Sequence, residues 1–128
     1  MTVALLDRES RALVQRLRIW TPTRWAAAAR PGLTRGDLAH HLAAVLAEAG
    51  GAPVALPRLS SDLALPDQLA VTAADLVRSG PSDEVARTST AHLLWHRHEL
   101  LADDVPAGLA TALGLPDVLE AGRTACSL

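Results

Sequence analysis

The 128-residue sequence lacks tyrosine, phenylalanine and lysine, and its only aromatic side chains apart from histidine are three tryptophans. β-Branched and aromatic residues are scattered, and no segment shows the alternation of apolar and polar residues that is typical of a half-buried strand. Helix signals are frequent instead. We therefore predict an all-α fold without a sheet, and the length suits one domain over residues 1–128.

Other absences exclude whole classes of protein. The single cysteine, Cys126, has no partner for an internal disulfide. No apolar run approaches the roughly 18–20 residues that span a bilayer, and "MTVALLDRESRALV" becomes charged too early for a signal peptide. We expect a cytoplasmic protein with no membrane association.

The charge pattern bears on the class of partner. The net charge is −2, and all twelve basic residues are arginines dispersed along the chain. A concentrated phosphate-binding patch is missing, so nucleic acid is not expected as the main partner.

Apolar periodicity and helix-end signals predict four main helices. Thr34 and Asp37 form the expected capping box of the second helix, whereas "TPTRWAAAARPG" before it is predicted as a loop. Two shorter helices are expected in "PAGLATALG" and "PDVLEAG". The main helices are predicted at about 3–20, 34–50, 66–80 and 82–102.

The connection between the second and third helices, "GGAPVALPRLSSDLAL", has sixteen residues and no periodicity. Connections of this length are unusual in compact domains. Antiparallel neighbours need only a short turn, whereas parallel neighbours need a crossover along the bundle. The sequence therefore predicts an up-down-down-up four-helix bundle in which the second and third helices run in the same direction.

The five histidines form two clusters, in "DLAHHL" and in "TAHLLWHRHEL". His92 and His96 are four residues apart, which places them on one helix face with Cβ atoms about 5–6 Å apart. Two imidazoles at this spacing can converge on one metal ion. His98 points about 200° away from His96 around the helix.

His41 is the candidate third ligand, because it lies within the apolar stripe of the second helix and His40 does not. His41 lies about 10 Å from the start of that helix, at 1.5 Å per residue. His92 and His96 lie at a similar depth if the second and fourth helices are antiparallel. Three imidazoles are then expected to meet in the core with an open position for water or substrate. The alternative is that these histidines are hydrogen-bonded core and surface residues without a metal.

These motifs resemble those of the DinB-like superfamily, which includes mycothiol-dependent maleylpyruvate isomerases and bacillithiol S-transferases. The D/E-L-x-x-H-L motif of that family is similar to "DLAHHL" and selects His41. Its H-x-x-x-H-R-G-Q motif is similar to "HLLWHRHEL" and selects His92, His96 and Arg97, with His98 and Glu99 in place of glycine and glutamine. The Arg24-Trp25 pair is similar to a tryptophan-containing site ahead of the family's second helix.

The resemblance covers essentially the whole chain and implies an up-down-down-up bundle. It also implies a divalent metal, zinc or nickel, on His41, His92 and His96. Family members with known chemistry activate the thiolate of a low-molecular-weight thiol, and many others have no assigned substrate. The arginine bias, which indicates a high-GC bacterial genome, fits mycothiol as that thiol.

The leading hypothesis is accordingly a metal-dependent transferase, isomerase or lyase that acts on a small molecule in detoxification or secondary metabolism. A metal would lower the pKa of a bound thiol or water. Arg97 or Arg24 is the candidate holder of a substrate carboxylate, and Glu99 is either a partner that orients the ligands or a surface charge. A homodimer is compatible with such a bundle.

Two other classes remain open at the level of sequence. One is a metal-free helical partner or dimerisation protein in which the histidines only pack. The other is a helix-turn-helix DNA-binding module, because "LTRGDLAHHLAAVLAEAGG" contains a T-x-x-D-L-A start. The acidic balance of the chain opposes the second option.

Overall fold

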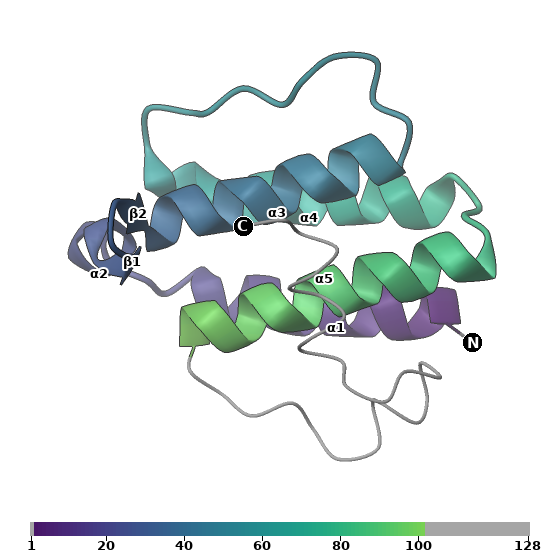
Figure 1. Cartoon of the computed structure of the whole chain (residues 1–128), viewed down its shortest axis with the longest axis horizontal. Helices are drawn as coiled ribbons and strands as arrows, with labels where there is room; N and C mark the ends of the chain where they lie inside the picture. The colour runs from purple at the N-terminus through teal and green to yellow at the C-terminus, as the bar shows by residue number, and fades with distance from the viewer. Residues whose placement is uncertain (1, 102–128) are drawn as a thin grey trace.

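The structure is a computed structural model that describes residues 2–101 of the chain. Within that range most residues are helical, and Figure 1 shows the long helices packed side by side. The prediction of an all-α fold is confirmed for this part of the chain, apart from one small sheet. Both shorter predicted helices and Cys126 lie outside the described residues. The long helices are α1 (Thr2–Leu17), α3 (Arg35–Ala49), α4 (Leu65–Arg78) and α5 (Asp83–Leu101).

The ends of α3 and α4 show that these two helices run in the same direction. At their N-terminal ends, a Cβ atom on Gly36 would lie 2.6 Å from Oδ2 of Asp62. At their C-terminal ends, a Cβ atom on Gly50 would lie 3.4 Å from the Cα atom of Leu76. Residues 50–64 return along the two helices between these ends, as Figure 1 shows.

The other two helices run the opposite way. The Thr2 hydroxyl donates to the Asp83 carboxylate over 2.7 Å, so the N-terminal ends of α1 and α5 meet. Arg18, just after α1, pairs with Asp67 in the first turn of α4 at 2.5 Å. In this arrangement α3 packs against α4 and α5, and α1 packs against the same two helices.

The loop predicted before α3 is in fact structured, and the prediction of no sheet is wrong. Thr21 caps a short helix, α2 (Pro22–Ala26), by accepting a hydrogen bond from the Arg24 amide. A two-stranded antiparallel sheet follows, β1 (Ala28–Arg30) with β2 (Leu33–Thr34). Gly32 adopts a φ of 76°, a conformation that glycine reaches without strain, and so closes the hairpin. Strands this short carry no readable periodicity in the sequence.

Capping fixes the start of α3, the helix that carries His41. The Thr34 hydroxyl accepts from the Asp37 amide at 3.0 Å, and the Asp37 carboxylate accepts from the Thr34 amide at 3.1 Å. This reciprocal pair is the predicted capping box. It sets the depth of every residue along α3.

A single cluster of buried apolar side chains joins the helices. Trp25 and Trp95 are its largest members, and leucines from all four long helices complete it. Trp25, which lies in α2, packs against Trp20 with ring centres 4.7 Å apart. Among residues 2–101, none of the helices combines the length and the apolar character needed to cross a bilayer.

Candidate functional site

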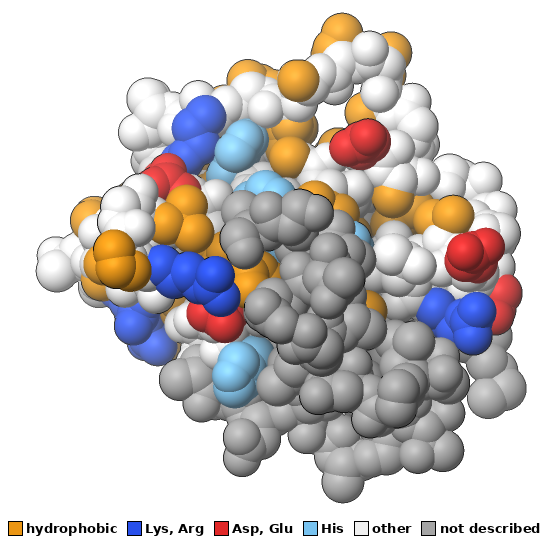
Figure 2. All heavy atoms as spheres, viewed as in Figure 1, with side chains coloured by type: hydrophobic (Ala, Val, Ile, Leu, Met, Phe, Trp, Pro, Cys, Tyr) orange, Lys and Arg blue, Asp and Glu red, His pale blue; other side chains and the backbone are white. Residues whose placement is uncertain are grey.

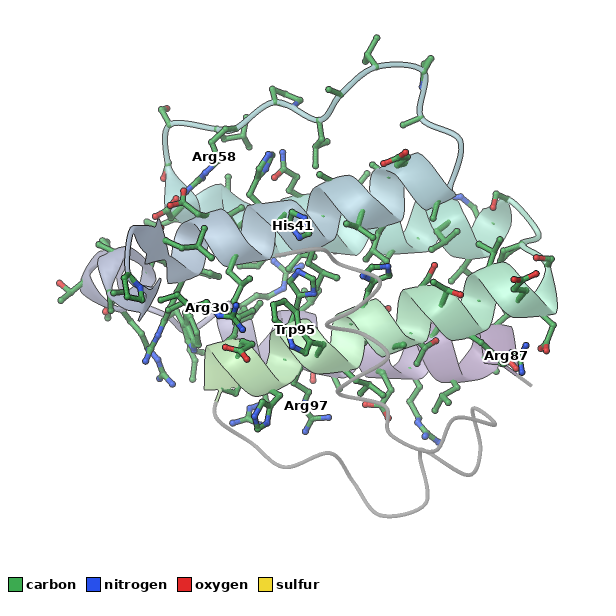
Figure 3. The ribbon with its side chains drawn as sticks, viewed as in Figure 1. Arg30, His41, Arg58, Arg87, Trp95 and Arg97 are labelled. Atoms are coloured by element: carbon green, nitrogen blue, oxygen red, sulfur yellow. The ribbon has the colours of Figure 1, made fainter. Side chains whose placement is uncertain are left out.

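His41 of α3 and His96 of α5 face each other across the interface between their helices. The His41 Nδ1 and His96 Nε2 atoms are 3.0 Å apart. Their rings are nearly parallel, at an angle of 18° with centres 5.3 Å apart. The structure thus brings together two of the three predicted ligands, and Figure 3 shows His41 on the α3 side of this interface.

The second ring nitrogen of His96 determines which protons the pair holds. Its Nδ1 atom is 2.6 Å from the backbone carbonyl oxygen of His92, which can only accept. In the neutral ring, Nδ1 therefore carries the proton and Nε2 presents its lone pair to His41. His41 Nδ1 then donates to His96 Nε2. A backbone carbonyl that orients a histidine in this way is typical of metal-binding imidazoles.

Burial keeps the histidines of this interface neutral. His96 is fully buried, and loss of hydration lowers its pKa to about 3 despite the opposing hydrogen bond to the His92 carbonyl. Burial also lowers the pKa of His41 and that of His92, and charge repulsion, from His40 on His41 and from His41 on His92, acts in the same direction. Neutral imidazole is the form that binds metal.

His92 lies close enough to His41 and His96 to affect the pKa of His96, yet its ring does not complete a metal site as it stands. It is 7% exposed and lines a cavity of about 260 Å³ between α3 and the first half of α5. Within residues 2–101, no group of three histidine, cysteine or acidic side chains is arranged to hold an ion. The structure thus places two of the three predicted ligands in direct contact and does not complete the set.

The distance between the two facing nitrogens is compatible with one shared divalent ion. Two nitrogens that are each about 2.0–2.1 Å from one zinc ion lie about 2.8–3.4 Å apart, at bond angles from 90° to tetrahedral. The 3.0 Å between His41 and His96 falls inside that range. Because His41 Nδ1 donates in the present hydrogen bond, this nitrogen would have to lose its proton before it could bind such an ion.

His40, the neighbour of His41, points to a different helix. Its Nδ1 atom lies 3.4 Å from the Gln68 side-chain oxygen on α4, and the Gln68 amide nitrogen donates to the Pro57 carbonyl at 3.1 Å. This contact joins α3, α4 and the crossover. His40 is thus a matched control for His41, one residue away on the same helix.

The two arginines predicted to hold a substrate carboxylate have other partners. Arg97 pairs with Glu9 of α1 at 3.3 Å, with both side chains largely buried. Arg24 is exposed, and its guanidinium stacks over Trp20 at 4.4 Å from the ring centre. Glu99, predicted to be either an orienting partner of the ligands or a surface charge, forms an ion pair with Arg30 at 3.2 Å.

Sequence reasoning missed Trp95 and Arg30. The Trp95 ring meets His96 edge-on with centres 4.9 Å apart. The Arg30 guanidinium lies 5.1 Å from the centre of the Trp95 ring. The position of Trp95 between His92 and His96 in "HLLWH" was an available signal for a residue beside the ligands. Arg30 had no such signal, because its position depends on the β1–β2 hairpin.

Comparison with known proteins identifies no relative of this chain. Its sequence matches no protein-family model, and neither the curated proteins nor the solved structures yield a significant match.

Proposed function

We propose that the protein is a metal-dependent enzyme acting on a small molecule, with His41, His92 and His96 as ligands of one divalent ion. The single observation that carries this proposal is the 3.0 Å approach of His41 Nδ1 to His96 Nε2, with the other His96 nitrogen held by a carbonyl. We also propose that the long helices form an up-down-down-up four-helix bundle, which the shared direction of α3 and α4 supports.

The protein residues have separate roles in this proposal. His41 and His96 hold the ion from two different helices, and His92 joins them by rotating its side chain. The His92 carbonyl fixes the orientation of the His96 ring. Trp95 packs edge-on against that ring, which is fully buried. Zinc or nickel, when bound, supplies Lewis acidity that lowers the pKa of a coordinated thiol or water.

The reaction class follows from the resemblance to the DinB-like superfamily. We propose a thiol-dependent transferase, isomerase or lyase, with mycothiol as the candidate thiol. The residues of "DLAHHL" and "HLLWHRHEL" that carry the resemblance include the two histidines now seen in contact. The acceptor is a small molecule of detoxification or secondary metabolism.

Thermal unfolding of the untagged, metal-free protein tests the site. A bound ion stabilises the folded state by RT ln(1 + [L]/Kd), so zinc at 100 times Kd is expected to add about 2.7 kcal/mol. The resulting rise in melting temperature at pH 7.5 should be much smaller at pH 5.5, where protons compete for imidazole nitrogen. His96→Ala should remove most of the response and His98→Ala should leave it. Equal responses in the two variants would contradict the proposal.

A second candidate function is a metal-free partner protein in which the histidines only pack. The direct hydrogen bond between His41 and His96 favours it, because the two facing ring nitrogens already satisfy each other's hydrogen-bonding capacity without a metal. The helix-turn-helix alternative has less support. Such a module needs a second helix directly after a short turn, whereas residues 52–61, which follow α3, form neither helix nor strand.

A further inference from the structure

A cavity of about 260 Å³ lies between the second half of α3 and the first half of α5, beside the histidine pair. The two helices run in opposite directions, so the end of α3 faces the start of α5. In Figure 2, orange hydrophobic side chains lie at the right of this face with charged side chains at its outer edge, where Figure 1 draws these helix ends. The cavity is lined by Val45, Ala49, Glu84, Val85, Thr88, Ser89 and His92.

Exposure changes from one end of this cavity to the other. Ala49, Glu84 and Thr88 are exposed and form its mouth, and the two lining valines are half-buried and form its walls. Ser89 and His92 are 2% and 7% exposed and form its floor. The cavity thus combines an open mouth, apolar walls and a polar floor.

The Ser89 hydroxyl at the floor of the cavity forms no hydrogen bond with any of residues 2–101. The neighbouring hydroxyl differs, because Thr90 donates to the Ala86 carbonyl at 2.7 Å. A buried hydroxyl without a partner is costly, and buried polar groups in folded proteins are almost always hydrogen-bonded. We therefore expect the partner of Ser89 to be a molecule that occupies the cavity.

The size and the walls of the cavity favour an occupant larger than a water molecule. One water takes up about 30 Å³ of liquid, whereas a cavity of about 150 Å³ is enough for a benzene ring. The side chains of Val45, Ala49 and Val85 offer no hydrogen bonds to water, and they present apolar surface to an apolar group. A single ring with a small polar substituent fits both the volume and this lining.

The charge of the lining determines which polar substituent suits the cavity. Glu84 contributes a carboxylate at the mouth, and no arginine is among the described residues that line it. An anionic substituent is therefore disfavoured by repulsion. A hydroxyl group both donates and accepts a hydrogen bond, so it complements the Ser89 hydroxyl in either direction.

We propose that this cavity binds a small neutral molecule made of one apolar ring and one hydroxyl group, and that the ligand hydroxyl forms a hydrogen bond with Ser89. The site goes beyond the proposed function, since it requires no ion at the histidine pair. It assigns to the cavity a ligand class, small aromatic alcohols, and it assigns to Ser89 the selection of the hydroxyl.

The test is a titration of the isotope-labelled, metal-free full chain, followed by the amide signals in its nuclear magnetic resonance spectrum. The probes are benzyl alcohol, toluene, which lacks the hydroxyl, and benzoate, which carries a negative charge. Benzyl alcohol should shift the signals of Val45 and Ser89 with saturation. Benzoate should bind more weakly, because its carboxylate meets that of Glu84.

A matched pair of variants isolates the hydroxyl of Ser89. Ser89→Ala should weaken the binding of benzyl alcohol about fivefold, the scale of one hydrogen bond, and leave that of toluene unchanged. It should not lower the melting temperature, because the hydroxyl has no partner among the described residues. Thr90→Val is the control, since the Thr90 hydroxyl is already bonded to a backbone carbonyl, and it should leave the affinity for both probes unchanged.

Ala49→Leu places a larger side chain at the exposed mouth and should weaken the binding of benzyl alcohol and toluene together. Equal affinity of Ser89→Ala and wild type for benzyl alcohol would overturn the inference. The absence of saturable shifts at Val45 and Ser89 would also overturn it, and the cavity would then hold water. Because the titrations use metal-free protein, a failure to bind zinc would contradict the proposed function and leave this inference standing.

Discussion

The α1–α4 and α3–α5 interfaces differ in what they bury. The α1–α4 interface contributes apolar side chains to the core, such as Val14 and Ala73, and keeps its Arg18–Asp67 ion pair at the exposed edge. The α3–α5 interface buries two histidines of α5, His92 and His96, and brings a third imidazole from α3 against them. One interface follows the ordinary rule for a core, and the other departs from it.

The apolar side chains of the first interface are what folding requires, whereas the buried histidines of the second are tolerated at a cost in free energy. Burial penalises the charged form of each imidazole, so the pKa values of His41, His92 and His96 all lie below the ordinary value. Apolar side chains of similar volume would fill the same space without this penalty. This cost of burying the imidazoles is the physical reason for proposing that the α3–α5 interface is the functional one.

The largest expected effect is on the apolar side. Leu13→Ala removes a side chain that is 1% exposed, and it should lower the free energy of unfolding by about 3 kcal/mol through lost burial and a residual cavity. Urea denaturation at pH 7.5 measures the change. The control is Ile19→Ala, at a residue that is 82% exposed, which should change stability by less than about 0.5 kcal/mol.

The next effect belongs to the histidine side and depends on pH. The folded-state pKa of His96 is lowered to about 3, below the unfolded value, so its stabilising contribution is present above pH 6.5 and is lost as the pH falls. Between pH 6.5 and 5.0, His96 alone should reduce the free energy of unfolding by about 2 kcal/mol. Urea titrations of the metal-free protein in a chelator measure this slope.

His96→Leu sharpens the same comparison, because it removes one titrating group from the interface. The slope of the free energy of unfolding with pH should fall by about one proton in His96→Leu. The slope is measured between pH 6.5 and 5.0 so that Asp37 does not contribute to it. Hydrogen bonding to the Thr34 amide lowers the pKa of Asp37, which then titrates only at more acidic pH. An unchanged slope in His96→Leu would show that the ring does not stay neutral in the fold.

A smaller effect is expected at the start of α3. Thr34→Ala removes the hydroxyl that caps the Asp37 amide, and it should cost about 1 kcal/mol. Because this cap fixes the depth of His41, the variant should also bind zinc more weakly than wild type. Thr34→Ser, which keeps a capping hydroxyl, should restore most of both quantities.

The smallest effect is expected at the α1–α4 edge. Arg18→Gln breaks an ion pair whose two side chains are 49% and 74% exposed. Solvent screens such pairs, so the free energy of unfolding should change by about 0.5 kcal/mol or less. A loss well above 1 kcal/mol would mean that this edge, rather than the apolar core, holds α1 against α4.

Local signals made much of the helical framework predictable. The capping box at Thr34 and the length of the crossover predicted where α3 begins and in which direction α4 runs. The distances of His41 and His96 from the ends of their helices were enough to predict that the two side chains lie at the same level of the bundle. The sequence did not predict α2, which contains Trp25, or the β1–β2 hairpin, which positions Arg30. Elements of two to five residues are determined by turns and tertiary contacts rather than by periodicity.

The rotamer of His92 illustrates another limit of sequence reasoning. A spacing of four residues puts His92 and His96 on one face of α5, but it does not decide which way each ring turns. In the structure the His96 ring meets His41, and the His92 ring lines the neighbouring cavity. The metal site thus remains a prediction that only measurement of bound metal can test.

The most direct measurement is the zinc stoichiometry of untagged protein after dialysis at pH 7.5, determined by elemental analysis for wild type, His41→Ala and His40→Ala. We predict one zinc ion per chain in wild type and in His40→Ala, because His40 contacts Gln68 rather than His96. His41→Ala, which removes the ring 3.0 Å from His96, should retain almost none. Equal zinc content in the two variants, or no zinc in wild type, would contradict the account.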